Sequence, residues 1–319
     1  MRFRMIFFIT GFFLSSSLLL QAQVQLHTIQ VKTPKATHRF FKYSGQQFPL
    51  ISGHRGGSVP GFPENSIEAL ENTLKYTPAF FEIDPRLTKD SVIVLLHDAT
   101  MERTTTGKGK LADYTWEELQ NIRLKNIKGQ ITDFKIPKLE DVIIWARGKT
   151  ILNLDIKDVP FEMTATLIRK LKAEAFVMVT VHNPEQAKFY YDRIPSITFS
   201  AHVKNKKAFE AYDRSGFPWG QGIAYIGSKI QPQNKQLYEL LHAKGTPCMI
   251  SAAPGFDKLG RVEDRKAAYL NVFQDGADIL ETDLPIEAGV AIAGLLPKKS
   301  AKRKFFKTKT VQNYFPHVH

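Results

Sequence analysis

Residues 49–84 read PLISGHRGGSVPGFPENSIEALENTLKYTPAFFEID and contain one complete strand–helix–strand unit. The short apolar runs at 50–54 and 79–84 have the length and composition of buried strands. Between them, residues 65–76 follow a Pro-Glu pair of the kind that begins helices, which predicts a helix there. A strand, a helix and a second strand in this order indicate a parallel sheet with crossover helices.

The same alternation continues through residue 297. Apolar runs recur eight times, at 50–54, 79–84, 150–157, 176–181, 197–202, 220–225, 247–251 and 278–283. Helical patterns lie between most of them, at 65–76, 139–146, 161–172, 184–192, 204–215, 234–243, 263–274 and 286–295. This predicts an α/β fold, a (β/α)8 barrel of the TIM type over residues 49–297. A doubly wound open sheet is the alternative, although no glycine-rich nucleotide-binding motif begins any helix.

One segment departs from the alternation after the second strand. A turn at 88–90 and a ninth apolar run at 92–96 lead into a polar stretch that reaches residue 136. We expect a small insertion at about 98–136, above the barrel, where such excursions often shape a substrate pocket.

The positive charge of the chain is concentrated at its two ends. The formal net charge is +13, yet the first 48 residues hold six Lys or Arg and the last 22 hold seven, with no acid in either segment. The neutral segment between them argues against a nucleic-acid-binding domain. A hydrophobic content of 43% excludes a disordered protein, and a single cysteine excludes a disulfide scaffold or a multi-cysteine zinc site.

The amino terminus has the layout of a secretory signal peptide. Residues 1–4 are basic, residues 5–20 are mostly apolar, and Ala22 is a small residue near the expected cut. We predict a cleaved signal over 1–22 and a periplasmic or secreted protein, with an uncleaved anchor as the alternative. Residues 23–48 are predicted to form a basic arm on the domain surface. The basic tail, 298–319, contains aromatic residues and is predicted to be a flexible solubilising segment or to lie on an anionic membrane surface.

Three acidic residues stand at the carboxyl ends of predicted strands, where barrel enzymes place their reactive groups. Glu82 and Asp84 are two residues apart and point to one face of a strand, and Asp155 ends the next barrel strand. Converging carboxylates repel unless a cation lies between them, and oxygen ligands suit Mg²⁺ or Ca²⁺. The alternative is a structural set of ion pairs with Arg86 or Lys157.

Two histidines also end apolar runs, His54 in the first strand and His97 after the ninth run. Imidazoles can accept and donate protons near neutral pH. Displacement at a phosphodiester needs one group that accepts a proton and another that donates one. Arg55 and Lys157 could hold the phosphate oxygens, or could instead be counter-ions of the acids.

The strings HRGGSVPGFPENSIEAL, FFEIDPRLTKDSVIVLLHDATMERTTTGKG and KIPKLEDVIIWARGKTILNLDIK resemble the glycerophosphodiester phosphodiesterase family, and ILETDLP resembles its late strand end. The resemblance is dense over 49–157 and returns at 277–285. It implies metal-dependent hydrolysis of glycerophosphodiesters to glycerol 3-phosphate and an alcohol on a barrel with a small insertion. It also implies one divalent metal ion, Mg²⁺ or Ca²⁺, and a small-molecule phosphodiester as substrate.

The resemblance assigns roles residue by residue. It implies that Glu82, Asp84 and Asp155 are metal ligands, that His54 and His97 are the acid/base pair, and that Arg55 and Lys157 contact phosphate. It further implies that Glu64 orients the loop after the first strand, near the substrate. These assignments are expectations for the structure.

The sequence departs from the family pattern around the substrate. The third metal ligand is usually Glu but is Asp155 here, and His182-Asn183 and 251–253 replace the usual residues at two later strand ends. We therefore expect His182 to border the head group, and Trp219, near the sixth strand, to face the pocket. The alternatives to glycerophosphodiester hydrolysis are a phosphoinositide- or lysophospholipase-D-type diesterase and a non-catalytic phosphodiester-binding protein.

Overall fold

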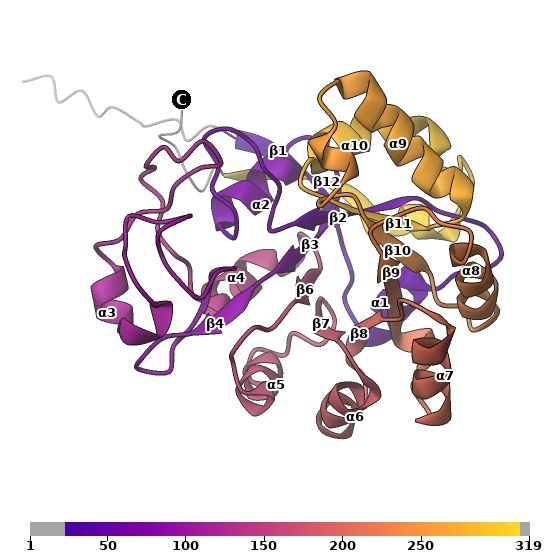
Figure 1. Ribbon diagram of the computed structural model, residues 1–319, viewed down its shortest axis with the longest axis horizontal. Helices are drawn as coiled ribbons and strands as arrows, with labels where there is room; N and C mark the ends of the chain where they lie inside the picture. The colour runs from indigo at the N-terminus through magenta and orange to yellow at the C-terminus, as the bar shows by residue number, and fades with distance from the viewer. Residues whose placement is uncertain (1–22, 313–319) are drawn as a thin grey trace, which may run out of the picture.

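The structure is a computed structural model that describes residues 23–312, and its central element is a closed barrel of eight parallel strands (Figure 1). The strands, in chain order, are β2 (Leu50–His54), β3 (Phe80–Ile83), β6 (Leu152–Leu154), β7 (Val177–Val181), β8 (Thr198–His202), β9 (Gly222–Gly227), β10 (Cys248–Ser251) and β11 (Ile279–Thr282). Parallel pairing of β11 with β2 closes the circle. The predicted (β/α)8 barrel is thus confirmed, and the open sheet is excluded.

Each barrel strand is followed by a helix that packs outside the barrel. These helices are α2 (Ile67–Leu74), α4 (Leu139–Ala146), α5 (Phe161–Lys170), α6 (Pro184–Arg193), α7 (Lys206–Arg214), α8 (Asn234–Ala243), α9 (Val262–Asp275) and α10 (Pro285–Ile292). Side chains that accept a backbone N–H begin several of them, because the first turn of a helix leaves its donors unpaired. Ser66 caps α2, Asn183 caps α6 and Asn205 caps α7 in this way.

The insertion lies between β3 and α4 and forms a lobe of its own, on the left of Figure 1. It begins at once after β3 with a hairpin of β4 (Pro85–Leu87) and β5 (Ile93–Leu95), so the run at 92–96 is its second strand. The short helix α3 (Trp116–Leu119) follows. A separate small apolar cluster, which includes Val94, Met101 and Leu124, stabilises the lobe.

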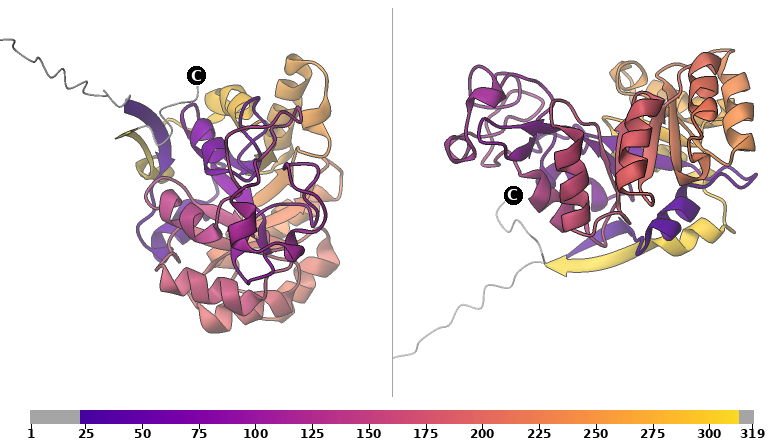
Figure 2. Two further views of the ribbon diagram at one scale, coloured as in Figure 1. Left: turned by 90° about the vertical axis from the view of Figure 1, so that its left-hand side faces the viewer. Right: turned by 90° about the horizontal axis from the view of Figure 1, so that it is seen from below.

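The segments expected to form a surface arm and a free tail contribute to the fold instead. Strand β1 (Gln23–Ile29) pairs antiparallel with β12 (Phe306–Gln312), and α1 (Pro34–Phe41) lies beside this ribbon (Figure 2). The backbone N–H of Tyr43 bonds to the carbonyl of Gly245, just before β10, so the arm covers the amino-terminal end of the barrel. Phe40 and Phe41 are fully buried there. Amphipathic spacing in α1, which places its aromatic residues on one face, explains why this basic segment packs inward.

The predicted signal peptide, residues 1–22, and the last residues of the tail, 313–319, lie outside the described residues. Within 23–312, no helix combines the length and the apolar character needed to cross a bilayer.

Candidate active site

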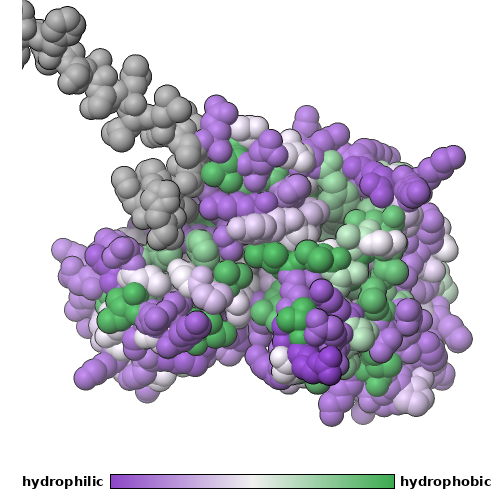
Figure 3. Space-filling model, turned by 90° about the horizontal axis from the view of Figure 1, so that it is seen from above, coloured by the Kyte–Doolittle hydropathy of each residue, from purple (hydrophilic) through white to green (hydrophobic). Residues whose placement is uncertain are grey.

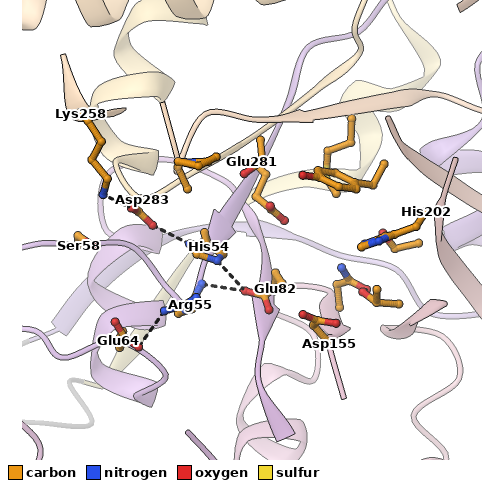
Figure 4. Close-up of a pocket in the computed structure, with 18 of the residues that line it drawn as sticks. His54, Arg55, Ser58, Glu64, Glu82, Asp155, His202, Lys258, Glu281 and Asp283 are labelled. Atoms are coloured by element: carbon orange, nitrogen blue, oxygen red, sulfur yellow. Dashed lines mark hydrogen bonds and ion pairs between the residues drawn. The ribbon is translucent and has the colours of Figure 1, made fainter. Parts of the chain in front are cut away.

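A cavity of about 520 Å³ opens at the carboxyl ends of the barrel strands (Figure 4). Most of the side chains that line it are polar or charged, and they come from all eight barrel strands or from the loops that follow them. They include His54, Arg55, Glu64, Glu82, Arg103, Asn153, Asp155, Thr180, His202, Tyr225, Ser251, Lys258, Glu281 and Asp283. Parallel strands in a barrel all end on one rim, and for this reason residues distant in sequence meet in one cavity.

The loop after β2 folds tightly, and the neighbouring side chains of His54 and Arg55 both face the cavity. Arg55 has a φ of 53°, and Gly56 and Gly57 also have positive φ values, a conformation that glycine adopts without cost. A Cβ on Gly57 would lie 2.7 Å from a side-chain carbon of Pro285, so glycine is required on steric grounds as well. Arg55 is a non-glycine residue in a strained conformation, which turns its guanidinium toward the acidic residues of the site.

His54 is held by a carboxylate from the last strand of the barrel. Its Nδ1 lies 2.6 Å from Oδ1 of Asp283, and its Nε2 lies 3.8 Å from Glu82. Burial opposes protonation of His54, but the hydrogen bond to Asp283 and the negative charges of Glu281 and Asp283 together outweigh burial and raise the pKa of the imidazole. The bond at Nδ1 leaves Nε2 as the nitrogen that can exchange a proton in the cavity.

Asp283 is itself fixed from two sides. The buried carboxylate of Asp257 accepts hydrogen bonds from the backbone N–H of Asp283 and from the hydroxyls of Thr282 and Tyr269. The ammonium of Lys258 lies 3.1 Å from Oδ2 of Asp283, the oxygen that does not face His54. The orientation of His54 is therefore set by the loop after β10 as well as by its own strand.

The three acidic residues predicted to bind a metal lie together. One oxygen from each of Glu82, Asp84 and Asp155 lies within 4.8 Å of the other two. Burial raises the pKa of Glu82 well above its usual value, and the neighbouring carboxylates add to this effect. For Asp84 burial acts in the same direction, but Lys157 and Arg55 outweigh it and lower the pKa.

The cations near this cluster also take part in ion pairs with it. Lys157 lies 2.9 Å from Asp84 and 2.5 Å from Asp155, and Arg55 lies 3.3 Å from Asp84. No Lys or Arg forms an ion pair with Glu82 in the part of the chain that the structure describes. The all-oxygen donor set and its buried, unbalanced negative charge fit a hard divalent cation such as Mg²⁺ or Ca²⁺.

Arg86, the other counter-ion considered from the sequence, points elsewhere. Its guanidinium bonds to Asp158 and to the carbonyl of His97. It therefore fastens the insertion to the loop after β6 and leaves the acidic cluster to Lys157 and Arg55.

The second histidine, His97, belongs to the insertion. Its Nδ1 lies 2.7 Å from Asp98, which is paired with Arg103. Arg103 in turn bonds to Glu64, and Glu64 bonds to Arg55, so a chain of charged groups links the insertion to the barrel loop. His97 is 35% exposed and is not among the residues that line the cavity, although Glu64 and Arg103 are.

His182 lies beside Asp155 but is not among the residues that line the cavity, whereas its neighbour His202, which the sequence did not indicate, is among them. His182 Nε2 lies 3.4 Å from Asp155, and its Nδ1 lies 3.1 Å from Nδ1 of His202. Burial and the neighbouring His182 lower the pKa of His202 to about 3, so His202 is neutral at physiological pH. His202 and Tyr225 pack against each other on the cavity wall.

The prediction that Trp219 faces the pocket is wrong. Trp219 precedes β9 and therefore lies at the amino-terminal end of the barrel, opposite the cavity. Its indole stacks on Phe209 and donates a hydrogen bond to Asp213, and its carbonyl accepts one from Thr246. Its position before the strand, not after it, was the signal that could have excluded it.

Asp283 and Glu281 were not predicted to belong to the site, although both end the eighth apolar run. Glu281 is buried on the cavity wall, where burial raises its pKa. Their position at a strand end was the available signal, but only the closure of β11 onto β2 brings Asp283 to His54.

Comparison with known proteins agrees with this arrangement. A sequence model of the glycerophosphoryl diester phosphodiesterase family matches residues 54–207. The crystal structure of a glycerophosphoryl diester phosphodiesterase from Parabacteroides distasonis is 53% identical, with a TM-score of 0.87 over 89% of this chain and 100% of that one.

Other relatives match over a shorter segment or at lower sequence identity. Glycerophosphodiester phosphodiesterase 1 of Bos taurus is 34% identical over 121 residues, which are 36% of this chain and 35% of that protein. A phosphodiesterase of Oleispira antarctica, solved with the product sn-glycerol-3-phosphate, shares the fold at 19% identity and a TM-score of 0.57, over 77% of this chain and 97% of that one. The matched region spans between 35 and 46% of the length of the first curated relatives. The match to the Parabacteroides structure covers the whole of that chain, and the family model matches residues 54–207. The chain therefore belongs to the glycerophosphoryl diester phosphodiesterase family.

Proposed function

We propose that this protein hydrolyses glycerophosphodiesters to glycerol 3-phosphate and an alcohol, in a reaction that depends on a divalent metal ion. The observation that carries the proposal is the acidic cluster of Glu82, Asp84 and Asp155, which lies beside a cavity that His54 and Arg55 also line. Family membership supports the same reaction class.

Glu82, Asp84 and Asp155 would hold the metal ion. A divalent cation bound there would neutralise charge on the phosphate oxygens and so make the phosphorus easier to attack. Arg55 lies beside these acids and can bond to a phosphate oxygen with the N–H groups that its carboxylate partners leave free.

His54 is proposed to move a proton at Nε2. Asp283 fixes its Nδ1 and stabilises the imidazolium form, as a carboxylate does for the histidine of other hydrolytic sites. His97, in the insertion, is proposed to carry out the second proton transfer. Asp98 holds Nδ1 of His97 as Asp283 holds Nδ1 of His54. One histidine would take a proton from the attacking oxygen, and the other would give a proton to the departing alcohol oxygen.

The test is turnover of glycerophosphocholine by the purified protein, with and without a chelator. We expect release of glycerol 3-phosphate and choline that stops with EDTA and returns when Mg²⁺ or Ca²⁺ is added. His54→Ala should lower kcat by roughly 10²–10⁴-fold, with the fold intact by circular dichroism. Release of phosphocholine, or no turnover of any diester, would favour a different diesterase or a binding protein.

We also propose, from the sequence, that the protein is exported to the periplasm or secreted and that its basic tail contacts anionic lipid. Fractionation of expressing cells tests export, and detection of the protein only in the cytoplasm would contradict it. Co-sedimentation with phosphatidylglycerol vesicles, but not phosphatidylcholine vesicles, tests the contact of the tail; equal behaviour with both would contradict it.

A further inference from the structure

A second cluster of metal-binding side chains lies at the amino-terminal end of the barrel, opposite the cavity. Cys248 is the first residue of β10, Asp278 directly precedes β11, and His242 lies in the last turn of α8. The thiol sulfur, a carboxylate oxygen and an imidazole nitrogen of these residues lie within 4.8 Å of one another. None of the three residues lines the active-site cavity, so the proposed hydrolysis gives them no role.

The cluster is buried on the barrel side and reaches solvent at its histidine. Figure 3 shows that the outer face over α9 and α10 is largely hydrophilic, with apolar side chains between the polar ones, as expected of helices that cover a barrel. Cys248 and Asp278, at the starts of inner strands, are 0% and 3% exposed, whereas the side chain of His242 is 19% exposed. The ring of Tyr43 stacks on the His242 imidazole, with 3.7 Å between centroids and 6° between planes. An ion can therefore enter beside His242, whose ring orientation is already fixed.

Asp278 has one oxygen that is bonded and one that has no partner. Its Oδ2 accepts the backbone N–H of Cys248 at 2.9 Å and lies 2.7 Å from Nε2 of His242. Its Oδ1 is buried and has no hydrogen-bond partner. A carboxylate oxygen buried in this way costs free energy unless an ion or a water molecule meets it. Among the residues that the structure describes, no Lys or Arg forms an ion pair with Asp278, and Lys302 donates its hydrogen bond to the carbonyl of Phe41 instead.

We propose that His242, Cys248 and Asp278 bind a zinc ion. Sulfur, imidazole nitrogen and carboxylate oxygen form a donor set that suits zinc, unlike the all-oxygen set of the acidic cluster. Tetrahedral zinc, with bonds of about 2.0–2.3 Å, sets its ligand atoms roughly 3.3–3.7 Å apart, so the separations here change by about 1.5 Å or less. On binding, a bond forms between sulfur and zinc and the thiol proton passes to water. The ion joins α8 to the starts of β10 and β11 and stabilises the folded chain, because the unfolded chain offers no such site.

The experiment uses the purified protein, freed of metal with a chelator and then kept in millimolar Mg²⁺ to fill the acidic cluster. Titration with Co²⁺, a spectroscopic substitute for Zn²⁺, should produce the near-ultraviolet absorption band of a cobalt–thiolate bond. Cys248 is the only cysteine of the chain, so this band reports on the proposed site alone. Added Zn²⁺ should abolish the band by displacing cobalt and should raise the melting temperature.

His242→Gln removes the most exposed ligand, so the fold should tolerate it. It should weaken zinc binding by at least roughly tenfold and abolish the zinc-dependent rise in melting temperature. Asp275→Asn is the matched control, because Asp275 ends α9 shortly before Asp278 but pairs with Lys235 and Tyr238. This control should keep its zinc affinity within about twofold of the unsubstituted protein.

Absence of the thiolate band would overturn the inference, and so would equal zinc affinities of the His242→Gln and Asp275→Asn proteins. Hydrolysis of glycerophosphocholine, measured with Mg²⁺ on the same samples, should be the same within about twofold with or without zinc, because the two sites lie at opposite ends of the barrel. Loss of hydrolysis in every sample would refute the proposed function and leave the zinc site standing.

Discussion

Replacing Asp283 with asparagine would remove the charge that holds Nδ1 of His54, with almost no change in side-chain volume. The bond is short, at 2.6 Å, and Asp283 is fixed by Asp257 and Lys258, so the neighbouring structure should keep the asparagine in the same place. The neutral amide can present its oxygen or its NH₂ group to the imidazole, but it cannot stabilise the imidazolium as a carboxylate does.

The expected loss follows from the strength of a charge-assisted hydrogen bond. Such a bond contributes roughly 1.5–3 kcal/mol, which corresponds to a decrease in kcat of roughly 10- to 150-fold. The same bond raises the pKa of His54, so its removal should move the inflection that His54 gives in the pH profile to lower pH. Substrate KM should change little, because both carboxylate oxygens of Asp283 are already engaged, by His54 and by Lys258.

The assay is the steady-state rate of glycerophosphocholine hydrolysis from pH 5 to 9, with the melting temperature measured in parallel. Lys258→Met is the matched comparison, because Lys258 holds the other oxygen of Asp283 but is 63% exposed. An exposed ion pair contributes at most about 1 kcal/mol, so this variant should lose less than about fivefold in kcat. An Asp283→Asn enzyme with unchanged kcat and an unchanged pH profile would refute the role given to the Asp283–His54 pair.

Three further outcomes are expected. Asp155→Asn should raise the metal concentration needed for half-maximal activity by at least roughly tenfold, and an unchanged metal titration would remove Asp155 from the ligand set. His97→Ala should lower kcat by roughly 10²–10⁴-fold with an unchanged melting temperature, and near-normal turnover would exclude His97 from proton transfer. Burial raises the pKa of Glu68 from 4.5 to about 7, so ionisation of Glu68 destabilises the folded state as the pH rises through this range. Glu68→Gln should therefore raise the melting temperature at pH 8, by roughly 2–4 °C for each 1 kcal/mol recovered, but not at pH 4.5; a pH-independent shift would contradict this assignment.

Much of the site could be predicted because barrel chemistry follows strand order. Glu82, Asp84 and Asp155 each end or follow a strand, and all strand ends meet on one rim, so their proximity was predictable before any distance was known. Trp219 shows the limit of this reasoning, because a residue just before a barrel strand lies at the opposite end of the barrel from a residue just after it.

The ends of the chain were harder to interpret. The basic composition of 23–48 predicted a surface arm, yet Phe40 and Phe41 are buried under the barrel and β1 pairs with β12. Lys302, from the predicted tail, is buried too, donates a hydrogen bond to the carbonyl of Phe41, and has its pKa lowered by burial to about 8. Net charge describes how a segment interacts with solvent, but it does not reveal a partner strand almost 300 residues away.

The alternation of strands and helices and the residues of the acidic cluster could be predicted from the sequence, because hydrophobic periodicity and residue type are local properties of the chain. Closure of the sheet into a barrel, the groups that orient His54 and the position of His97 became known from the folded structure alone. These features depend on the closure of β11 against β2 and on loops from separate units meeting at the rim. Contacts of that kind are set by long-range packing and leave no periodic signal in the sequence.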